Sequence, residues 1–293
     1  MIKHINIEQD VFFKYNGSIG VNPRLRKKKS SIRKADYRDN VKVVTDNRFI
    51  TAYGLQGISL KARKLLYIAI AQCKITDKEF YEFSITPLEF ADLMGISPTH
   101  IYEEADKITD ELMKGFIKVV PENEKKFKKY SLFSTCEYTQ DYEIKFKLNP
   151  DMTDFFLELK KNFSQPLLLD FMKMRSPYSI AIWHLIQREM ESKKPKTTEE
   201  FKFYVSLDEL RQVTGTEDKL KQLVNFKERV LDKALLEIKE TCWVDITYSN
   251  VKQGRTVIGF NFIARNIFHF DIESLDPEFI KRVQERAEAI NNV

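Results

Sequence analysis

The sequence lacks the features that mark several large classes of protein. Its three cysteines, Cys73, Cys136 and Cys242, lie far apart, in no CxxC pair and with no histidine at ligand spacing. This pattern fits a reducing cytosol and argues against a zinc module or a disulfide frame. No apolar run approaches the ~18 residues of a membrane span, and the first residues do not lead into a signal-peptide core. We therefore expect a cytoplasmic protein that does not contact a membrane.

The sequence also lacks recognisable catalytic motifs. There is no GxxxxGK[ST] loop, which argues against ATP-driven activity. The histidines are isolated, so none forms the pair that metal-dependent nicking enzymes use; they are His4, His100, His184 and His269. His184, beside Trp183, is interpreted as a histidine at the edge of the core and not as a ligand. The carboxylate pairs Glu217-Asp218 and Glu103-Glu104 fit a helix start and a solvated helix face. We expect no enzyme activity, no metal and no cofactor.

Length and charge set broad limits on the chain. Its 293 residues, of which 43% are hydrophobic, suffice for about two ordinary domains. Lysine and arginine (48) exceed aspartate and glutamate (43) by only five, so the placement of charge matters more than its total. Residues 24–38, "RLRKKKSSIRKADYR", form a basic cluster that opposes collapse into a core. We expect residues 1–42 to be a flexible basic arm, which either aids solubility or touches nucleic-acid phosphates.

One phrase occurs twice. The stretches "FSITPLEFADLMGI" and "FYVSLDELRQVTGT" begin at Phe83 and Phe203, an offset of 120 residues (203 − 83). Each combines an alternating strand, a Thr or Ser helix cap, a short amphipathic helix and a glycine stop. Equivalent positions keep the same type of residue: Phe83 and Phe203, Ile85 and Val205, Thr86 and Ser206, Glu89 and Glu209, Phe90 and Leu210, Leu93 and Val213, Gly95 and Gly215. Chance recurrence is the alternative, since caps and turns draw on few residue types.

The flanking segments repeat in the same order. Helical patterns precede the phrases at residues 59–73 and 176–190, and longer helical patterns follow at 97–115 and 217–240. Short strands come after each, with a lysine-rich turn in the first half and a turn at Lys252–Arg255 in the second. This order predicts an α+β fold of two tandem winged-helix domains related by internal duplication. We place the first at residues 43–170 and the second at 171–270, followed by a tail at 271–293.

In a helix-turn-helix the second helix enters the major groove, so the helix after each glycine is the candidate reader. Winding residues 219–239 as one helix places Gln222, Asn225, Arg229 and Lys233 opposite an apolar side. Amide and guanidinium groups pair bidentately with adenine and guanine edges. Three flanking lysines suit phosphate contacts: Lys219, Lys221 and Lys227. The alternative is an ordinary amphipathic helix with a solvated face.

The counterpart in the first half is acidic, which would repel phosphates along much of its length. Its residues suited to DNA are His100, Tyr102 and Lys107. The lysine-rich turn, interpreted as the first wing, adds Lys125, Lys126, Lys128 and Lys129. We therefore expect the second domain to supply most of the specificity, and the first to add phosphate contacts or a protein interface.

Several blocks resemble a known family. They are "TAYGLQGISLKARKLLYIAIAQ", "RSPYSIAIWHLI", "VSLDELRQVTG" and above all "FKERVLDKALLEIKETCWVDITYSNVKQGRTVIGFNF". Over residues 43–265 the chain resembles the Rep family of initiator replication proteins from bacterial iteron plasmids. The last block is the most specific, with its Phe-Lys-x-Arg start, Gly254-Arg255 in the turn, and alternating Phe260 and Phe262.

The resemblance implies a bacterial protein that binds repeated double-stranded origin DNA, with monomers that initiate replication and dimers that repress the initiator's own gene. It implies host replication proteins, such as a helicase or the chromosomal initiator, as further partners. Carried onto this chain, DNA contacts come from Lys219, Lys221, Gln222, Lys227, Arg229, Lys252 and Arg255. Glu228 departs from the consecutive basic residues of many relatives, so it either faces away from DNA or accepts from a cytosine amino group. A chromosomal transcription regulator and a partner-binding scaffold are the alternatives.

Overall fold

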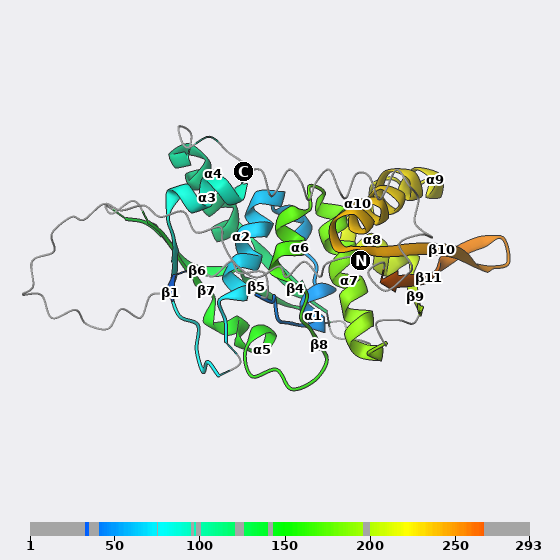
Figure 1. Ribbon diagram of the computed structural model, residues 1–293, viewed down its shortest axis with the longest axis horizontal. Coiled ribbons are helices and arrows are strands. Elements are labelled where there is room, and N and C mark those ends of the chain that lie inside the picture. The colour runs from blue at the N-terminus through cyan, green and yellow to red at the C-terminus, as the bar shows by residue number, and fades with distance from the viewer. Residues whose placement is uncertain are drawn as a thin grey trace, which may run out of the picture. The chain divides into compact units, whose positions relative to one another are not determined.

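The structure is a computed structural model (Figure 1). It describes residues 33–34, 41–74, 76–94, 97, 101–120, 126–139, 143–195 and 200–266, and the side chains of 33–34, 92–94, 101–102 and 266 are excluded. Most of the expected basic arm and the whole expected tail lie outside these residues. Among the helices of the described part, none is long and apolar enough to cross a membrane.

The first half opens with short elements and a buried helix. In chain order they are β1 (Arg33–Lys34), β2 (Thr45–Asp46), α1 (Asn47–Ile50), a 3-10 turn (Leu55–Gly57), α2 (Leu60–Ala71), β3 (Phe83–Ile85), α3 (Pro87–Met94) and α4 (Ile101–Lys114). Strands then follow: β4 (Phe116–Val119), β5 (Lys128–Ser131), β6 (Phe133–Tyr138) and β7 (Ile144–Leu148). A 3-10 turn (Pro150–Met152), α5 (Thr153–Phe156), β8 (Phe163–Ser164) and α6 (Leu168–Lys173) lead to the second half.

The second half has fewer and longer elements. They are α7 (Pro177–Lys193), β9 (Phe201–Ser206), α8 (Leu207–Thr214), α9 (Leu223–Phe226), a π-helical turn (Lys227–Leu231), α10 (Asp232–Cys242), β10 (Val244–Gln253) and β11 (Thr256–Asn266). Ser176 caps α7 by accepting a hydrogen bond from the Tyr178 backbone N–H, as Ser59 caps α2 through Ala62. Hydroxyl caps satisfy N–H groups that a helix start leaves unpaired.

The two halves share one sheet plan. In the first, β3 pairs with β7, which pairs with β6; in the second, β9 pairs with β11, which pairs with β10. Phe83 lies opposite Phe146 and Phe203 lies opposite Phe262, and the ring centroids of these stacked pairs are 5.2 and 5.1 Å apart. The same strands, in the same order and with the same aromatic pair at the centre, confirm the predicted duplication.

The repeated phrase forms the same local structure twice. The Glu89 N–H donates to Thr86 Oγ1 at 3.3 Å while the Glu89 carboxylate accepts from the Thr86 N–H at 2.8 Å, a reciprocal capping box. Ser206 Oγ accepts from the Glu209 N–H at 3.1 Å. Gly215 ends α8 with φ +64°, the left-handed conformation that glycine adopts without strain. Its predicted counterpart, Gly95, lies outside the described residues.

The predicted first wing is wrong. The lysine-rich segment belongs to a separate two-stranded sheet of β4 and β5, inserted between α4 and β6. By topology the first wing is the hairpin of β6 and β7, because these strands occupy the places of β10 and β11. The sequence pattern could not show this, because the short strands of the segment look alike and the pairing of β7 with the distant β3 decides which hairpin joins the sheet.

A buried histidine joins the two halves. His184 on α7 is 2% exposed, and its Nε2 lies 2.9 Å from Thr45 Oγ1 and its Nδ1 3.2 Å from Tyr67 Oη. It is therefore a core residue, set deeper than the predicted core edge. Burial, together with the charges of Arg63 and Arg188, lowers the pKa of His184 to about 3.

We expect His184 to make the fold sensitive to acid. Between the folded pKa of about 3 and the unfolded value of ~6.5, the unfolded chain binds the extra proton, so stability falls as pH falls through this window. From pH 7 to pH 5 the loss is about 2 kcal/mol in the free energy of unfolding. Urea unfolding of the wild type and His184→Gln at both pH values measures it. Equal pH slopes in the two proteins would contradict this assignment.

A pair of glutamines ties the first half to α8. The Gln56 side-chain amide donates to the carbonyls of Gln212 at 2.9 Å and Val213 at 3.0 Å. The Gln212 amide donates in turn to the Thr51 carbonyl. A Cβ at Gly215 would lie 2.5 Å from the Gln56 Cβ, so this close approach requires glycine as much as the positive φ does. The glutamines fix the carboxyl end of α8, and with it the start of the turn toward α9.

Candidate nucleic-acid interface

Arg211 on α8 organises the turn that precedes α9. Its guanidinium donates to four backbone carbonyls at 3.0–3.2 Å, those of Thr216, Lys219, Leu220 and Lys221. The guanidinium carbon also lies 4.8 Å from the centroid of the Phe226 ring. Sequence reasoning missed Arg211. An arginine five residues before a turn carries no local signal that the turn will wrap around it.

The predicted helix over residues 219–239 starts too early. Leu220 has φ +50°, which no continuous right-handed helix allows, and the helix begins at Leu223. Lys219, Lys221 and Gln222 therefore lie on the exposed turn before it. The π-helical turn Lys227–Leu231 then inserts an extra residue and shifts the face of everything that follows. We call α9, this turn and α10 together the reading helix.

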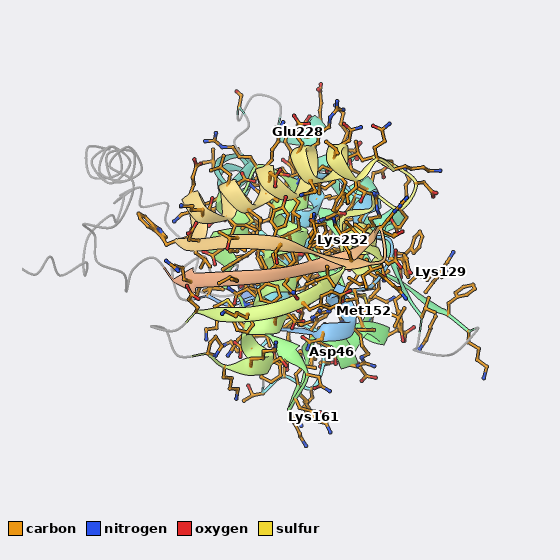
Figure 2. The ribbon with its side chains drawn as sticks, turned by 90° about the vertical axis from the view of Figure 1, so that its right-hand side faces the viewer. Asp46, Lys129, Met152, Lys161, Glu228 and Lys252 are labelled. Carbon is orange, nitrogen blue, oxygen red and sulfur yellow. The ribbon has the colours of Figure 1, made fainter. Side chains whose placement is uncertain are left out.

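The predicted polar stripe is largely present on the reading helix. Arg229 and Lys233 are exposed, and the Asn225 side-chain amide donates to Gln222 Oε1 at 2.9 Å. The opposite side is buried in the core, with Phe226, Val230, Leu231, Ala234, Leu235 and Ile238. Glu228 is exposed and points outward from the helix (Figure 2). The exposed residues of the reading helix thus carry amide, guanidinium and ammonium groups together with the carboxylates of Glu228 and Asp232.

Val224 is a second residue that the sequence analysis missed. It lies in the first turn of the reading helix, between Gln222 and Asn225, and 73% of its surface is exposed. An exposed valine among base-pairing side chains suits the methyl group of thymine, which is the apolar feature of the major groove. The sequence analysis considered only hydrogen-bonding and charged side chains as base contacts, so it passed over this valine.

The Lys227 side chain points toward the second wing and away from the polar stripe of the reading helix. Its Nζ lies 5.1 Å from the centroid of the Tyr248 ring and 3.5 Å from Asn250 Oδ1, both on β10. The Tyr248 hydroxyl donates to Asp232 Oδ1 at 2.6 Å. Burial, aided by the Asp232 carboxylate, raises the pKa of Tyr248, so this hydroxyl remains a donor. Lys227 and Asp232 therefore fix the reading helix to the second wing.

The second wing is a long hairpin, and its predicted turn is confirmed. The ladder of β10 and β11 runs from Val244 opposite Asn266 to Gln253 opposite Thr256. Gly254, with φ +61°, makes the turn. Lys252 and Arg255 are exposed near the tip, which extends beyond α8 and α10 (Figure 1). Cations at the end of such an arm are placed to follow a phosphate backbone.

Replacing Lys252 with alanine is expected to weaken binding similarly on all duplex sequences. A lysine that contacts phosphate carries no sequence information, so the salt slope of log K falls by about 0.9. Titrations of repeat-containing and random duplexes at several salt concentrations measure both effects. Lys161→Ala is the matched control, because it removes the same charge from an exposed loop between α5 and β8. A loss confined to the repeat duplex would contradict the phosphate role.

The residues predicted for the first half are not brought together. Lys107 is exposed on α4, 3.8 Å from the carboxylate of Glu104. His100 and Lys125 lie outside the described residues, as does the side chain of Tyr102. The remaining predicted lysines stand on the inserted hairpin: Lys126, Lys128 and Lys129. The acidic face of α4 is confirmed, since Glu103, Asp106 and Asp110 are exposed.

The described residues contain no candidate metal centre. Within that part of the chain, no group of three or more histidine, cysteine, aspartate or glutamate side chains could hold a metal ion. The three cysteines are free thiols, and burial raises the pKa of Cys136 to about 12.

The described fold defines a protein of two tandem winged-helix domains. Residues 42–187 match the family described as Initiator Replication protein, WH1, and residues 206–264 match the family described as Initiator Rep protein, WH2. The chain therefore belongs to the Rep family of initiator replication proteins. The first match extends into α7, a helix that contacts both halves through His184 and Arg188. The predicted boundary at residue 170 stays a prediction.

A solved structure of an initiator supports the fold. A structure of the Pi initiator protein in complex with iteron DNA is similar with a TM-score of 0.64 and 20% identity, over 78% of this chain and 98% of that chain. A structure of domains 2 and 3 of RctB gives a TM-score of 0.36 and 11% identity, over 75% of this chain and 82% of that chain. The comparison with curated proteins gave no match.

Proposed function

We propose that this protein is a sequence-specific DNA-binding initiator of plasmid replication that binds repeated sequences at its origin. The observation that carries the proposal is the exposure of Gln222 just before the reading helix and of Val224 and Arg229 on it. These side chains match adenine edges, thymine methyls and guanine edges respectively. The exposed cations of the preceding turn and of the second wing flank this face. The similarity to the Pi initiator, whose structure contains iteron DNA, supports the same ligand class.

The two domains divide the work unequally in this proposal. The second supplies base contacts and the first adds contacts of other kinds, because the exposed carboxylates of α4 repel phosphates. Family membership supports three further steps: opening of the origin, recruitment of host replication proteins, and repression of the initiator's own gene by a dimer. The protein acts in the bacterial cytoplasm by binding and without catalysis of its own.

A maintenance assay tests the replication role. A selectable DNA circle without an origin is joined to this gene and its flanking DNA, then introduced into a bacterial host. Stable maintenance that is lost when the reading frame is interrupted is the expected result. A winged-helix transcription regulator, the alternative function, would bind the flanking DNA without maintaining the circle. A protein-binding scaffold would bind no duplex with the steep loss of affinity at high salt that DNA binding requires.

A further inference from the structure

The inserted hairpin of β4 and β5 carries aromatic side chains on its outer face. Alternation along the strands puts Phe116 and Lys118 on one side, across from Ser131 and Lys129 of β5. Tyr53 extends this side through a bridge to Lys118. Phe127, just before β5, completes it. The three rings are 37% (Tyr53), 40% (Phe116) and 59% (Phe127) exposed.

The other side of the hairpin anchors it to the fold. Ile117 is fully buried, and the Tyr130 ring packs edge-on against Phe155 with centroids 5.2 Å apart. The outer rings are therefore not needed to hold the hairpin in place. Exposed aromatic rings forgo the stabilisation that burial gives, so three of them on one small sheet indicate a ligand.

Lysines alternate with the rings. Lys118 Nζ lies 5.6 Å from the centroid of Tyr53 and 4.8 Å from that of Phe127. Lys129 Nζ lies 4.9 Å from Phe116 and 5.7 Å from Phe127. Residues 116–131 contain five lysines and two glutamates, Glu122 and Glu124, so the segment carries a net positive charge. Figure 2 shows Lys129 on the hairpin, which projects from the side of the fold. A partner that matches this surface has flat rings to stack on the aromatic side chains and anionic groups between them to pair with the lysines.

We propose that this outer face binds single-stranded DNA, with bases stacked on Phe116 and Phe127 and phosphates beside Lys118 and Lys129. Successive aromatic rings on a cationic surface bind single strands with little sequence preference, because every base has a stacking face. Duplex DNA keeps its bases stacked inside and would use only the lysines. Origin opening supplies such a strand, and this source alone rests on the proposed function. The binding itself does not.

Fluorescence anisotropy with a 20-nucleotide oligo(dT) and with the repeat duplex tests the proposal. Phe127→Ala is expected to weaken oligo(dT) binding by roughly ten-fold or more and to leave duplex binding unchanged, because it removes one stacking surface. Phe127→Trp keeps a ring and is expected to retain at least wild-type affinity for the single strand. Leu88→Ala, which truncates another exposed apolar side chain on α3, is the matched control and is expected to change neither affinity.

Three results would overturn the proposal. They are wild-type protein that does not bind oligo(dT), Phe127→Ala with unchanged affinity for it, and equal loss on single strand and duplex. The first two would leave a protein partner as the occupant of the face, and the third would make the hairpin a general phosphate contact. If repeat-duplex binding is absent while oligo(dT) binding responds as expected, the proposed function fails and this inference stands. Thermal unfolding of each variant confirms that it is folded.

Discussion

Arg211→Ala is expected to abolish specific binding of origin repeats although the side chain does not face the groove. Its guanidinium holds four carbonyls of the turn that carries Lys219 and Lys221 to the reading helix. Without it, these carbonyls lose a charged donor and Leu220 loses the bonds that hold its left-handed backbone. Hydrogen bonds to charged groups contribute about 1.5–3 kcal/mol each. Because the site is half-exposed, we expect a net loss of about 2–3 kcal/mol in stability.

Two controls separate positioning from direct contact. Arg211→Lys keeps the charge but cannot span four carbonyls with a planar fork, so we expect it to resemble alanine. Because Arg211 does not contact phosphate, the salt slope of residual binding should stay at the wild-type value in both variants. Chemical unfolding and duplex titrations give both quantities. Normal stability and repeat affinity in Arg211→Ala would show that the turn holds without this side chain.

Arg229→Ala is expected to weaken binding to the repeats by about 1–3 kcal/mol and to relax sequence preference at one base pair. Arg229 is exposed on the π-helical turn, and Gln222 and Val224 are exposed at the start of the reading helix. Its guanidinium can pair with both acceptors of a guanine edge, which a lysine does with less geometric definition. Arg229→Lys should therefore retain non-specific affinity and lose part of the discrimination.

A panel of duplexes with single base changes measures the effect of Arg229→Ala. Arg229→Ala is expected to lose much affinity for the natural repeat. It is expected to lose little affinity for the duplex that is changed at the base pair Arg229 contacts. Equal losses of affinity for the repeat and for random DNA would show that Arg229 contacts a phosphate and not a base.

The features that sequence predicted well are local ones. Thr86 and Ser206 were predicted as caps because a hydroxyl before a helix bonds its own backbone, and the turn at Gly254 was predicted because glycine permits a positive φ. The duplication followed from the repetition of such signals in one order. The order of the helical patterns and the turn of the second wing were enough to predict two winged-helix domains.

The features that were predicted wrongly depend on contacts with other elements. The start of the reading helix depends on Arg211, and the position of Lys227 depends on Tyr248, a residue of another element. The inserted hairpin was taken for a wing because its strands alternate as a wing would. Only the pairing of β7 with β3, about 60 residues earlier, shows that the hairpin of β6 and β7 is the wing. Prediction failed where long-range contacts overrode a local pattern.

A footprint of the purified protein on the DNA flanking its own gene tests the central claim most directly. We expect protection of tandem direct repeats, spaced by roughly two helical turns of DNA, which disappears in Arg229→Ala at a concentration where Lys161→Ala still protects them. Uniform protection without repeats, or protection of a single palindrome that does not depend on Arg229, would contradict the account of the reading helix as the element that recognises the origin.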